Sequence, residues 1–193
     1  TVGPMTLADN AVLSADPTPG AGFIWLISES TIDALNPGNL TVTTGASANA
    51  RLDANGDIGT LANPLVVDTT GLFVLNDRGP FDVGGGGSGS VYITNQRAGT
   101  TNITTMQLDS GDAVIQAPGD IITSNFTGFD TSFTGAGDYT ITSTGGGIFG
   151  PDPITMGGGT VTLNSASDIG TSADPLEITG FGGLALDANG GAG

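Results

Sequence analysis

Asp53-x-Asn55-x-Asp57 places three oxygen-bearing side chains at alternate positions of the chain. Clustered carboxylate and amide oxygens are the ligands that Ca²⁺ prefers, and calcium loops of the EF-hand type open with this spacing. The pattern then departs from such a loop, because Ile58 stands where the loop needs Gly and no Glu follows at its twelfth position. The same residues suit a turn in which Asp and Asn side chains bond the corner backbone. We therefore expect Asp53, Asn55 and Asp57 to build a corner, with calcium as the alternative.

Other chemistries lack their atoms, because the chain has no His, no Cys and no Lys. Thiol nucleophiles, Cys/His zinc sites, Ser-His-Asp triads and Schiff bases are excluded. The cations are three arginines, each of which we expect to pair with Asp or to aid solubility: Arg51, Arg78 and Arg97. Carboxylate pairs that could act as acid and base on a glycan are Asp109/Asp112, Asp130/Asp138 and Asp152/Asp168. With 19 acidic residues such pairs arise by chance, so we expect no catalytic residues, no enzyme activity and no cofactor.

The charge balance restricts the partners. A net charge of −16 leaves no cation cluster for a phosphate backbone, which excludes nucleic acid as a partner. Apolar residues are spread evenly and form no 18-residue run, so we expect no membrane insertion. The acidic, Cys-free composition, rich in Thr and Asn, is typical of an exported bacterial protein, which predicts an extracellular or cell-surface location. Because the chain has neither an initiator Met nor a signal segment, we expect a processed chain or a piece of a larger one.

The elements that must position these residues are short strands. Segments of three to six residues alternate apolar side chains with Thr or Ser, as in 40–43, 91–94, 139–142 and 160–163. This period of two indicates strands with one buried face. The 34 Gly and 10 Pro, and the absence of a sustained helical period, argue against helices. The sequence predicts an all-β fold.

Internal repeats favour a solenoid. Residues 57–65 and 168–176 agree at seven of nine positions with an offset of 111, and Leu-Asp-Ala-Asn-Gly occurs at 52–56 and 186–190 with an offset of 134. A weaker Gly-Asp-Ile copy at 119–121 has an offset of 63 from Gly56. Divided by 5, 6 and 3, these offsets give 22.2, 22.3 and 21, a period typical of repeat architectures. We predict one right-handed parallel β-helix over 1–193 with eight or nine coils of about 22 residues, and Ile58 and Ile169 on the same wall. An antiparallel β-sandwich with partial duplication is the alternative.

The repeated unit, Asp-Ile-Gly-Thr-x-Ala-Asn/Asp-Pro-Leu followed by Gly-Leu-x-Leu, resembles the units of bacterial filamentous-haemagglutinin-like exoproteins and other giant repetitive surface adhesins. The resemblance covers about 40–75 and 160–190, and the first 38 residues do not match. It implies a long β-helical shaft, secreted across the outer membrane, that acts in adhesion, biofilm or display. It brings no catalytic residues with it.

Phe23-Ile24-Trp25-Leu26-Ile27 is the remaining candidate site. Five large apolar residues in a row cannot all face inward on a strand. Either residues 1–38 form an atypical cap over the first coil, or Phe23, Trp25 and Ile27 form an interface that joins rods end to end.

These observations predict a structural or adhesive segment that self-associates end to end into filaments and contacts a host or glycan surface. The alternative is a β-helix that binds or cleaves polysaccharide.

Overall fold

The computed structural model describes residues 4–7, 13–15, 23–28, 30–34, 40–44, 49–76, 89–108, 110–123, 132–133, 137–151, 153–173 and 175–189. Within these ranges every regular element is a strand, which confirms the all-β prediction. The strands are β1 (Met5–Leu7), β2 (Leu13–Ala15), β3 (Phe23–Ser28), β4 (Ile32–Ala34), β5 (Leu40–Thr44), β6 (Asn49–Ala54), β7 (Leu65–Asp68), β8 (Gly71–Asn76), β9 (Val91–Asn95), β10 (Thr101–Leu108), β11 (Ala113–Ala117), β12 (Ile121–Thr123), β13 (Ser132–Phe133), β14 (Tyr139–Ser143), β15 (Ile148–Phe149), β16 (Ile154–Met156), β17 (Thr160–Ser165), β18 (Ile178–Thr179) and β19 (Gly183–Ala188).

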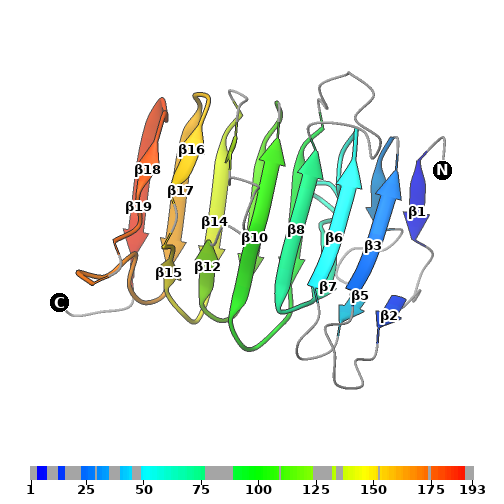
Figure 1. Cartoon of the computed structure of the whole chain (residues 1–193), viewed down its shortest axis with the longest axis horizontal. Helices are drawn as coiled ribbons and strands as arrows, with labels where there is room; N and C mark the ends of the chain where they lie inside the picture. The colour runs from blue at the N-terminus through cyan, green and yellow to red at the C-terminus, as the bar shows by residue number, and fades with distance from the viewer. Residues whose placement is uncertain are drawn as a thin grey trace.

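Two sheets face each other along a rod (Figure 1). Wall A contains, in spatial order, β2, β5, β7, β9, β11, β14, β17 and β19. Wall B contains β3, β6, β8, β10, β13, β16 and β18. Beside this path, β12 pairs with the first residues of β10, and β15 pairs with β12. Every strand pair in the described part of the chain is parallel, which confirms the β-solenoid and excludes the antiparallel sandwich.

The coil is longer than predicted, with successive coils about 24 residues apart. The corner positions before wall A show that the coil length varies. Their sequence offset is 33 from Asp57 to Ser90, 22 from Ser90 to Asp112 and 26 from Asp112 to Asp138. The coil length therefore varies between corners while the strands of successive coils stay paired in parallel, with register shifts only in the β5–β7 and β8–β10 pairs.

Ile58 and Ile169 lie on different walls, so the prediction of a shared wall is wrong. Ile58 bridges Ile32 and Val91 at the start of wall A, whereas Ile169 bridges Ile148 beside wall B. A coil consists of two similar half-turns, and the same corner motif leads into either wall. At about 24 residues per coil, an offset of 111 is about four and a half coils.

The two copies of the motif nevertheless share one local structure. Gly59 has φ 66 and Gly170 has φ 65, a left-handed conformation that favours glycine. The N–H groups of both glycines donate to a carbonyl one coil below, Ile32 O and Ile148 O, each at 2.8 Å. The repeat therefore encodes a corner conformation, independent of which wall follows it.

Aliphatic columns fill the space between the walls. In wall A the pairing aligns Ile93, Ile115, Ile141, Leu163 and Leu186. The first four are at most 5% exposed. Alternating inward and outward side chains explain why short Ile-Thr and Leu-Thr patterns predicted these strands.

Polar side chains align at the corner that precedes wall A. In each coil, a side-chain oxygen accepts a hydrogen bond from the backbone N–H one coil further along. The column is Asp57, Ser90, Asp112, Asp138 and Thr160, with bonds of 2.7 to 3.1 Å. The prediction of a corner role is confirmed for Asp57, although its bond runs between coils and not within the same turn. It is wrong for Asp53, which lies on β6 and whose carboxylate accepts hydrogen bonds from Trp25 and Arg51.

Residues 1–38 contribute strands to the ladders. β1 pairs with β4, β2 with β5 and β3 with β6. β3 is the first strand of wall B, and its inward Leu26 is only 7% exposed. A capping role for this segment stays a prediction.

Candidate functional site

The outer face of wall B carries an aromatic and charged cluster. Trp25, Arg51 and Phe73 are register partners on β3, β6 and β8. The Arg51 guanidinium carbon lies 4.2 Å from the centroid of the Trp25 ring and 4.7 Å from that of Phe73. A guanidinium between two aromatic faces is held by cation–π attraction.

Asp53 completes this cluster. Its carboxylate accepts hydrogen bonds from Trp25 Nε1 at 2.7 Å and from Arg51 Nε at 2.9 and 3.0 Å. Arg51 Nη2 lies 2.9 Å from Asp53 Oδ2. The Asp53 residue has no exposed surface, whereas Trp25 is 49% exposed. The arrangement can bind a flat or apolar partner on the free side of the indole, but it offers no unpaired acid or base for catalysis.

The predicted interface residues fall on the flank of the rod. Trp25 and Ile27 alternate with the inward Leu26, so both face outward from wall B. The side chain of Phe23 lies outside the described residues. An interface through Phe23, Trp25 and Ile27 stays a prediction, but on this flank it would join rods side by side.

Two of the three predicted calcium residues have another role. Asp53 is occupied by Arg51 and Trp25, and Asp57 Oδ1 accepts the Ser90 N–H at 2.7 Å. The buried Asn55 Oδ1 has no hydrogen-bond partner among the described residues. Within the described ranges, no three carboxylate, His or Cys side chains gather as metal ligands. A cation here would have to displace Arg51 from Asp53, so the three residues do not fit a calcium loop.

We expect the thermal midpoint of the chain to change by less than about 2 °C between excess Ca²⁺ and excess EDTA, because the corner bonds do not require a metal. Circular dichroism melts in the two buffers measure this. A rise of about 5 °C or more with Ca²⁺, lost in Asp57→Asn, would establish a calcium site at the corner.

The predicted acid pairs give no convergent dyad in the described part of the chain. Asp109, Asp130 and Asp152, one member of each pair, lie outside the described residues. The carboxylates of Asp112 and Asp138 each accept a backbone N–H in the corner column. The arginine prediction is confirmed for Arg51 with Asp53 and for Arg97 with Asp68, and Arg78 lies outside the described residues.

Replacing Asp53 with Asn should lower the free energy of unfolding by about 2 to 3 kcal/mol, because the buried amide cannot satisfy the donors of Arg51 and Trp25 together. The matched control is Asp68→Asn in the partly exposed Arg97–Asp68 pair, which spans 3.3 Å and should cost less than about 1 kcal/mol. Urea unfolding of both variants provides the comparison. Equal losses would show that the cluster on wall B adds no special stability.

One row on the outer face of wall A is polar and carries no charge over most of its length. Register places Thr94, Gln116, Thr142 and Asn164 in one row, which ends at Asp187. Asn164 Nδ2 donates to Thr142 Oγ1 at 3.3 Å. These residues form a regular array of hydroxyl and amide groups.

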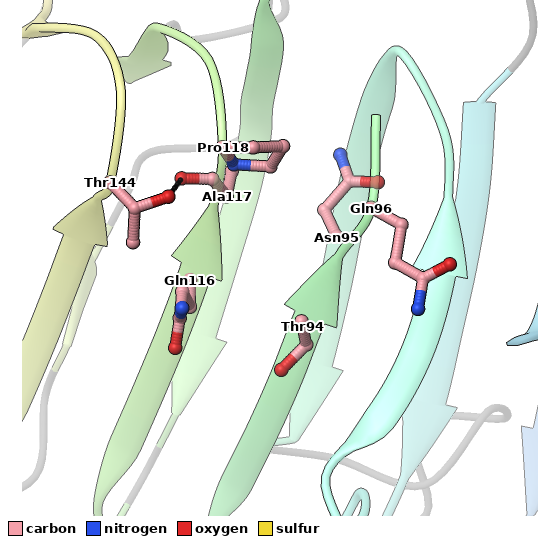
Figure 2. Close-up of a pocket in the computed structure, with 7 residues that line it drawn as sticks. All are labelled: Thr94, Asn95, Gln96, Gln116, Ala117, Pro118 and Thr144. Atoms are coloured by element: carbon pink, nitrogen blue, oxygen red, sulfur yellow. Dashed lines mark hydrogen bonds between the residues drawn. The ribbon is translucent and has the colours of Figure 1, made fainter. Parts of the chain in front are cut away.

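A shallow hollow of about 240 Å³ lies at the end of this array, where β9 and β11 turn into their corners (Figure 2). Its lining is neutral: Thr94, Asn95, Gln96, Gln116, Ala117, Pro118 and Thr144. Asn95 forms the buried floor, and its amide is already bonded to Thr69 and Thr101. The exposed amides of Gln96 and Gln116 can donate to and accept from hydroxyl groups, so the hollow suits a neutral polyhydroxyl ligand.

A tyrosine is buried within the core. Tyr139 is 2% exposed and lies between Ala113 and Val161 in an inward column of wall A. Burial, and to a smaller extent the Asp112 carboxylate, raises the pKa of Tyr139 to about 12.

This pKa predicts a loss of stability in alkali. Tyr139 is neutral in both states below pH 10, and above pH 10 the unfolded chain releases the phenol proton before the folded chain does. The free energy of unfolding should therefore fall by about 1.4 kcal/mol between pH 9 and pH 11 through this residue. Urea unfolding of the parent and of Tyr139→Phe measures the difference. The control variant Tyr92→Phe retains the buried Tyr139 phenol, so its free energy of unfolding should fall between pH 9 and pH 11 as much as that of the parent. An equal fall in Tyr139→Phe would contradict the prediction.

The corner columns and the hollow were not predicted from the sequence. Gly-Asp, Gly-Ser or Gly-Thr pairs precede an apolar residue at 56–57, 89–90, 111–112, 137–138 and 159–160. This pair occurs once per coil and is the signal that could have found the column. The hollow has no such signal, because its residues come from three corners, at the ends of β9, β11 and β14, and depend on their curvature.

Comparison of the chain with protein families, with curated proteins and with solved structures finds no match. The likeness to filamentous-haemagglutinin-like exoproteins thus rests on the repeated residues alone. In the described ranges no helix is long and apolar enough to cross a membrane.

Proposed function

We propose that this chain is a structural or adhesive segment of an extracellular bacterial surface or secreted protein, in which it acts as a stiff spacer and display element. The observation that carries the proposal is the continuity of the ladders. Strands, corner oxygens and aliphatic columns of one coil are bonded or packed directly on the next. A rod of this kind bends only if many backbone bonds yield together.

The surface supports the same role. A net charge of −16 keeps rods soluble and discourages lateral association. The neutral Thr, Gln and Asn array on wall A provides repeated weak contacts to a glycan or host surface. Such contacts become strong only when many copies act together. End-to-end association of rods belongs to this proposal.

The experiment compares glycan binding by the single free chain with glycan binding by many chains on one bead. Beads carrying the chain at high density, and the free chain, are tested against immobilised bacterial and host glycans. Retention of the beads with little retention of the free chain is expected. Beads carrying the chain after thermal unfolding, whose coils are no longer stacked, are the control. If the beads are not retained at any density, the adhesive role is wrong. If reducing ends are released from a glycan, the chain is an enzyme and the proposed structural role is wrong.

The hollow in Figure 2 favours a second candidate, a β-helix that binds polysaccharide at one defined site. In that case the free chain binds with measurable affinity, and Gln116→Ala weakens binding at least fivefold. Gln107→Ala, on β10 of wall B, is the matched control. A stacked aromatic groove would favour this candidate further, but Tyr139 is buried and Trp25 lies on the opposite wall from Tyr92.

A further inference from the structure

Polar side chains without partners lie side by side where β9 and β11 approach their corners. Within the described ranges, the side-chain amides of Gln96 and Gln116 form no hydrogen bond with the protein, and both residues are exposed. The same holds for the hydroxyl groups of Tyr92 and Thr94, which point outward from β9. Amides and hydroxyls both donate and accept, so these groups can bond a ligand that does the same.

The surroundings of these groups carry no unpaired positive charge in the part of the chain that the structure describes. Arg97 follows Gln96, but its guanidinium is paired with the Asp68 carboxylate at 3.3 Å. On the corner after β11, Asp120 accepts the N–H of Gly147 at 2.8 Å and keeps its negative charge at the surface. An anionic ligand would gain no ion pair here and would be repelled by a chain of net charge −16. The site therefore favours a neutral ligand.

The hollow of Figure 2 results from corners of unequal length. The corner after β11 contains three residues, 118–120, whereas those after β9 and β14 contain five and four, 96–100 and 144–147. A shorter corner protrudes less than its neighbours, which leaves a recess over Ala117 and Pro118. The volume of about 240 Å³ equals the liquid volume of about eight water molecules, which is enough for one sugar ring.

Apolar groups accompany the polar ones on both strands. The exposed Pro118 lies in the hollow, and Val114 is the outward register partner of Tyr92 at the other end of the strands. The C–H faces of a sugar can pack on such groups while its hydroxyls bond the amides. The distance along the strand from Tyr92 to Gln96 is about 13 Å, the length of about three sugars in an extended chain.

We propose that the outer faces of β9 and β11 bind a neutral, straight, β-linked oligosaccharide that runs parallel to the strands. One sugar lies in the hollow against Pro118, where its hydroxyls bond the amides of Gln96 and Gln116. The next sugars pass Thr94 and reach the ring of Tyr92. This inference rests on the glycan contact in the proposed function and gives that contact a sugar class and a direction. A curved, α-linked chain would leave the flat strands after one sugar.

Titration of the isotope-labelled chain with cellotriose, followed by NMR, tests the site. The side-chain NH₂ signals of Gln96 and Gln116 should shift with a dissociation constant in the millimolar range, because a short ligand makes few contacts. Maltotriose has the same sugar but α linkages, and it should bind at least about fivefold more weakly. Cellotriose with its primary hydroxyls oxidised to carboxylates should also bind at least about fivefold more weakly, because of charge repulsion.

Variants locate the two ends of the ligand. Gln116→Ala should weaken cellotriose binding about fivefold, because the hydrogen bonds of one amide are lost, and Tyr92→Ala should weaken it as much at the other end. Gln96→Ala changes only an exposed corner residue and provides the same test if Tyr92→Ala does not fold. Thr162→Val, on β17 of the same wall, is the matched control and should leave the affinity unchanged.

An unchanged spectrum in about 20 mM cellotriose would overturn the inference, as would equal binding of maltotriose or of the oxidised trimer. Equal weakening by Thr162→Val and Gln116→Ala would also overturn it. Beads that adhere to a glycan although cellotriose does not bind would remove this site and leave the proposed function standing. Cellotriose binding without retention of the beads on any glycan would leave the site and remove the adhesive role.

Discussion

Gly137→Ala should lower the free energy of unfolding by about 4 kcal/mol and the thermal midpoint by about 10 °C. A Cβ at Gly137 would overlap the carbonyl group of Gly111 in the preceding coil and would lie 3.2 Å from Asp112 N. All of these atoms belong to the backbone, so no side chain can turn aside. The coils would have to separate.

Separation at this point breaks bonds in two coils. Asp138 N donates to Asp112 Oδ1 at 3.0 Å, and Ala113 N donates to Asp138 O at 3.0 Å. The same close approach recurs along the rod, since a Cβ at Gly111 would overlap the Gly89 carbonyl and one at Gly89 would overlap Gly56. One glycine per coil is required because the corner brings successive backbones too close for a side chain.

Gly99→Ala is the matched control for Gly137→Ala. A Cβ at Gly99 meets no atom within 4 Å, so this change should alter stability by less than about 0.5 kcal/mol. Urea and thermal unfolding of both variants measure the contrast. If Gly137→Ala unfolds within about 2 °C of the parent, the column is not as tightly packed as described.

Asn95→Asp should lower the free energy of unfolding at pH 7 by about 3 to 5 kcal/mol, although it changes one NH₂ group into oxygen. Asn95 has no exposed surface. Its Nδ2 donates to Thr69 O and to Thr101 Oγ1, each at 2.8 Å, and its Oδ1 accepts from Thr69 N at 3.1 Å. The Thr101 hydroxyl can turn to donate to a carboxylate, but the Thr69 carbonyl cannot. The new charge would face that carbonyl in the interior.

The loss should depend on pH with a defined sign. Burial and the facing carbonyl raise the pKa of the new carboxyl above its unfolded value, so the cost is smallest when both states are protonated and grows as the pH rises. The difference in stability between variant and parent should therefore be larger at pH 7 than at pH 4. Urea unfolding at the two pH values measures it.

Asn63→Asp is the control for this experiment, because the second copy of the corner motif already has Asp at the matching position. The hydrogen bonds of Asn63 with Thr60 use its backbone N–H and carbonyl, which the change leaves in place. A change below about 0.5 kcal/mol is therefore expected. Equal effects at Asn63 and Asn95 would show that net charge, and not the buried network, controls stability.

The Asn95 network explains why its importance was not apparent from the sequence. Thr44, Thr69, Asn95 and Thr101 come from three coils, and the bond from Thr44 Oγ1 to Thr69 Oγ1 spans 2.9 Å across 25 residues. In the sequence these are ordinary polar residues next to strands. The fold turns the polar residues at the strand ends inward at the corner, and this placement buries their side chains.

The sequence alone determined the fold class and the parallel stack. Alternation of Ile, Leu and Val with Thr determines which face of a strand is buried, and Asp-Ile-Gly determines a left-handed corner whichever wall follows it. It also determined the absence of His, Cys and Lys chemistry.

Tertiary structure decided the relations between coils. A repeat specifies a local conformation, and the number of residues inserted at each corner sets which wall the next copy reaches. Ile58 and Ile169 therefore lie on different walls, and Arg51 lies between Trp25 and Phe73. These features depend on the sum of all corner lengths, a long-range quantity that no single motif contains.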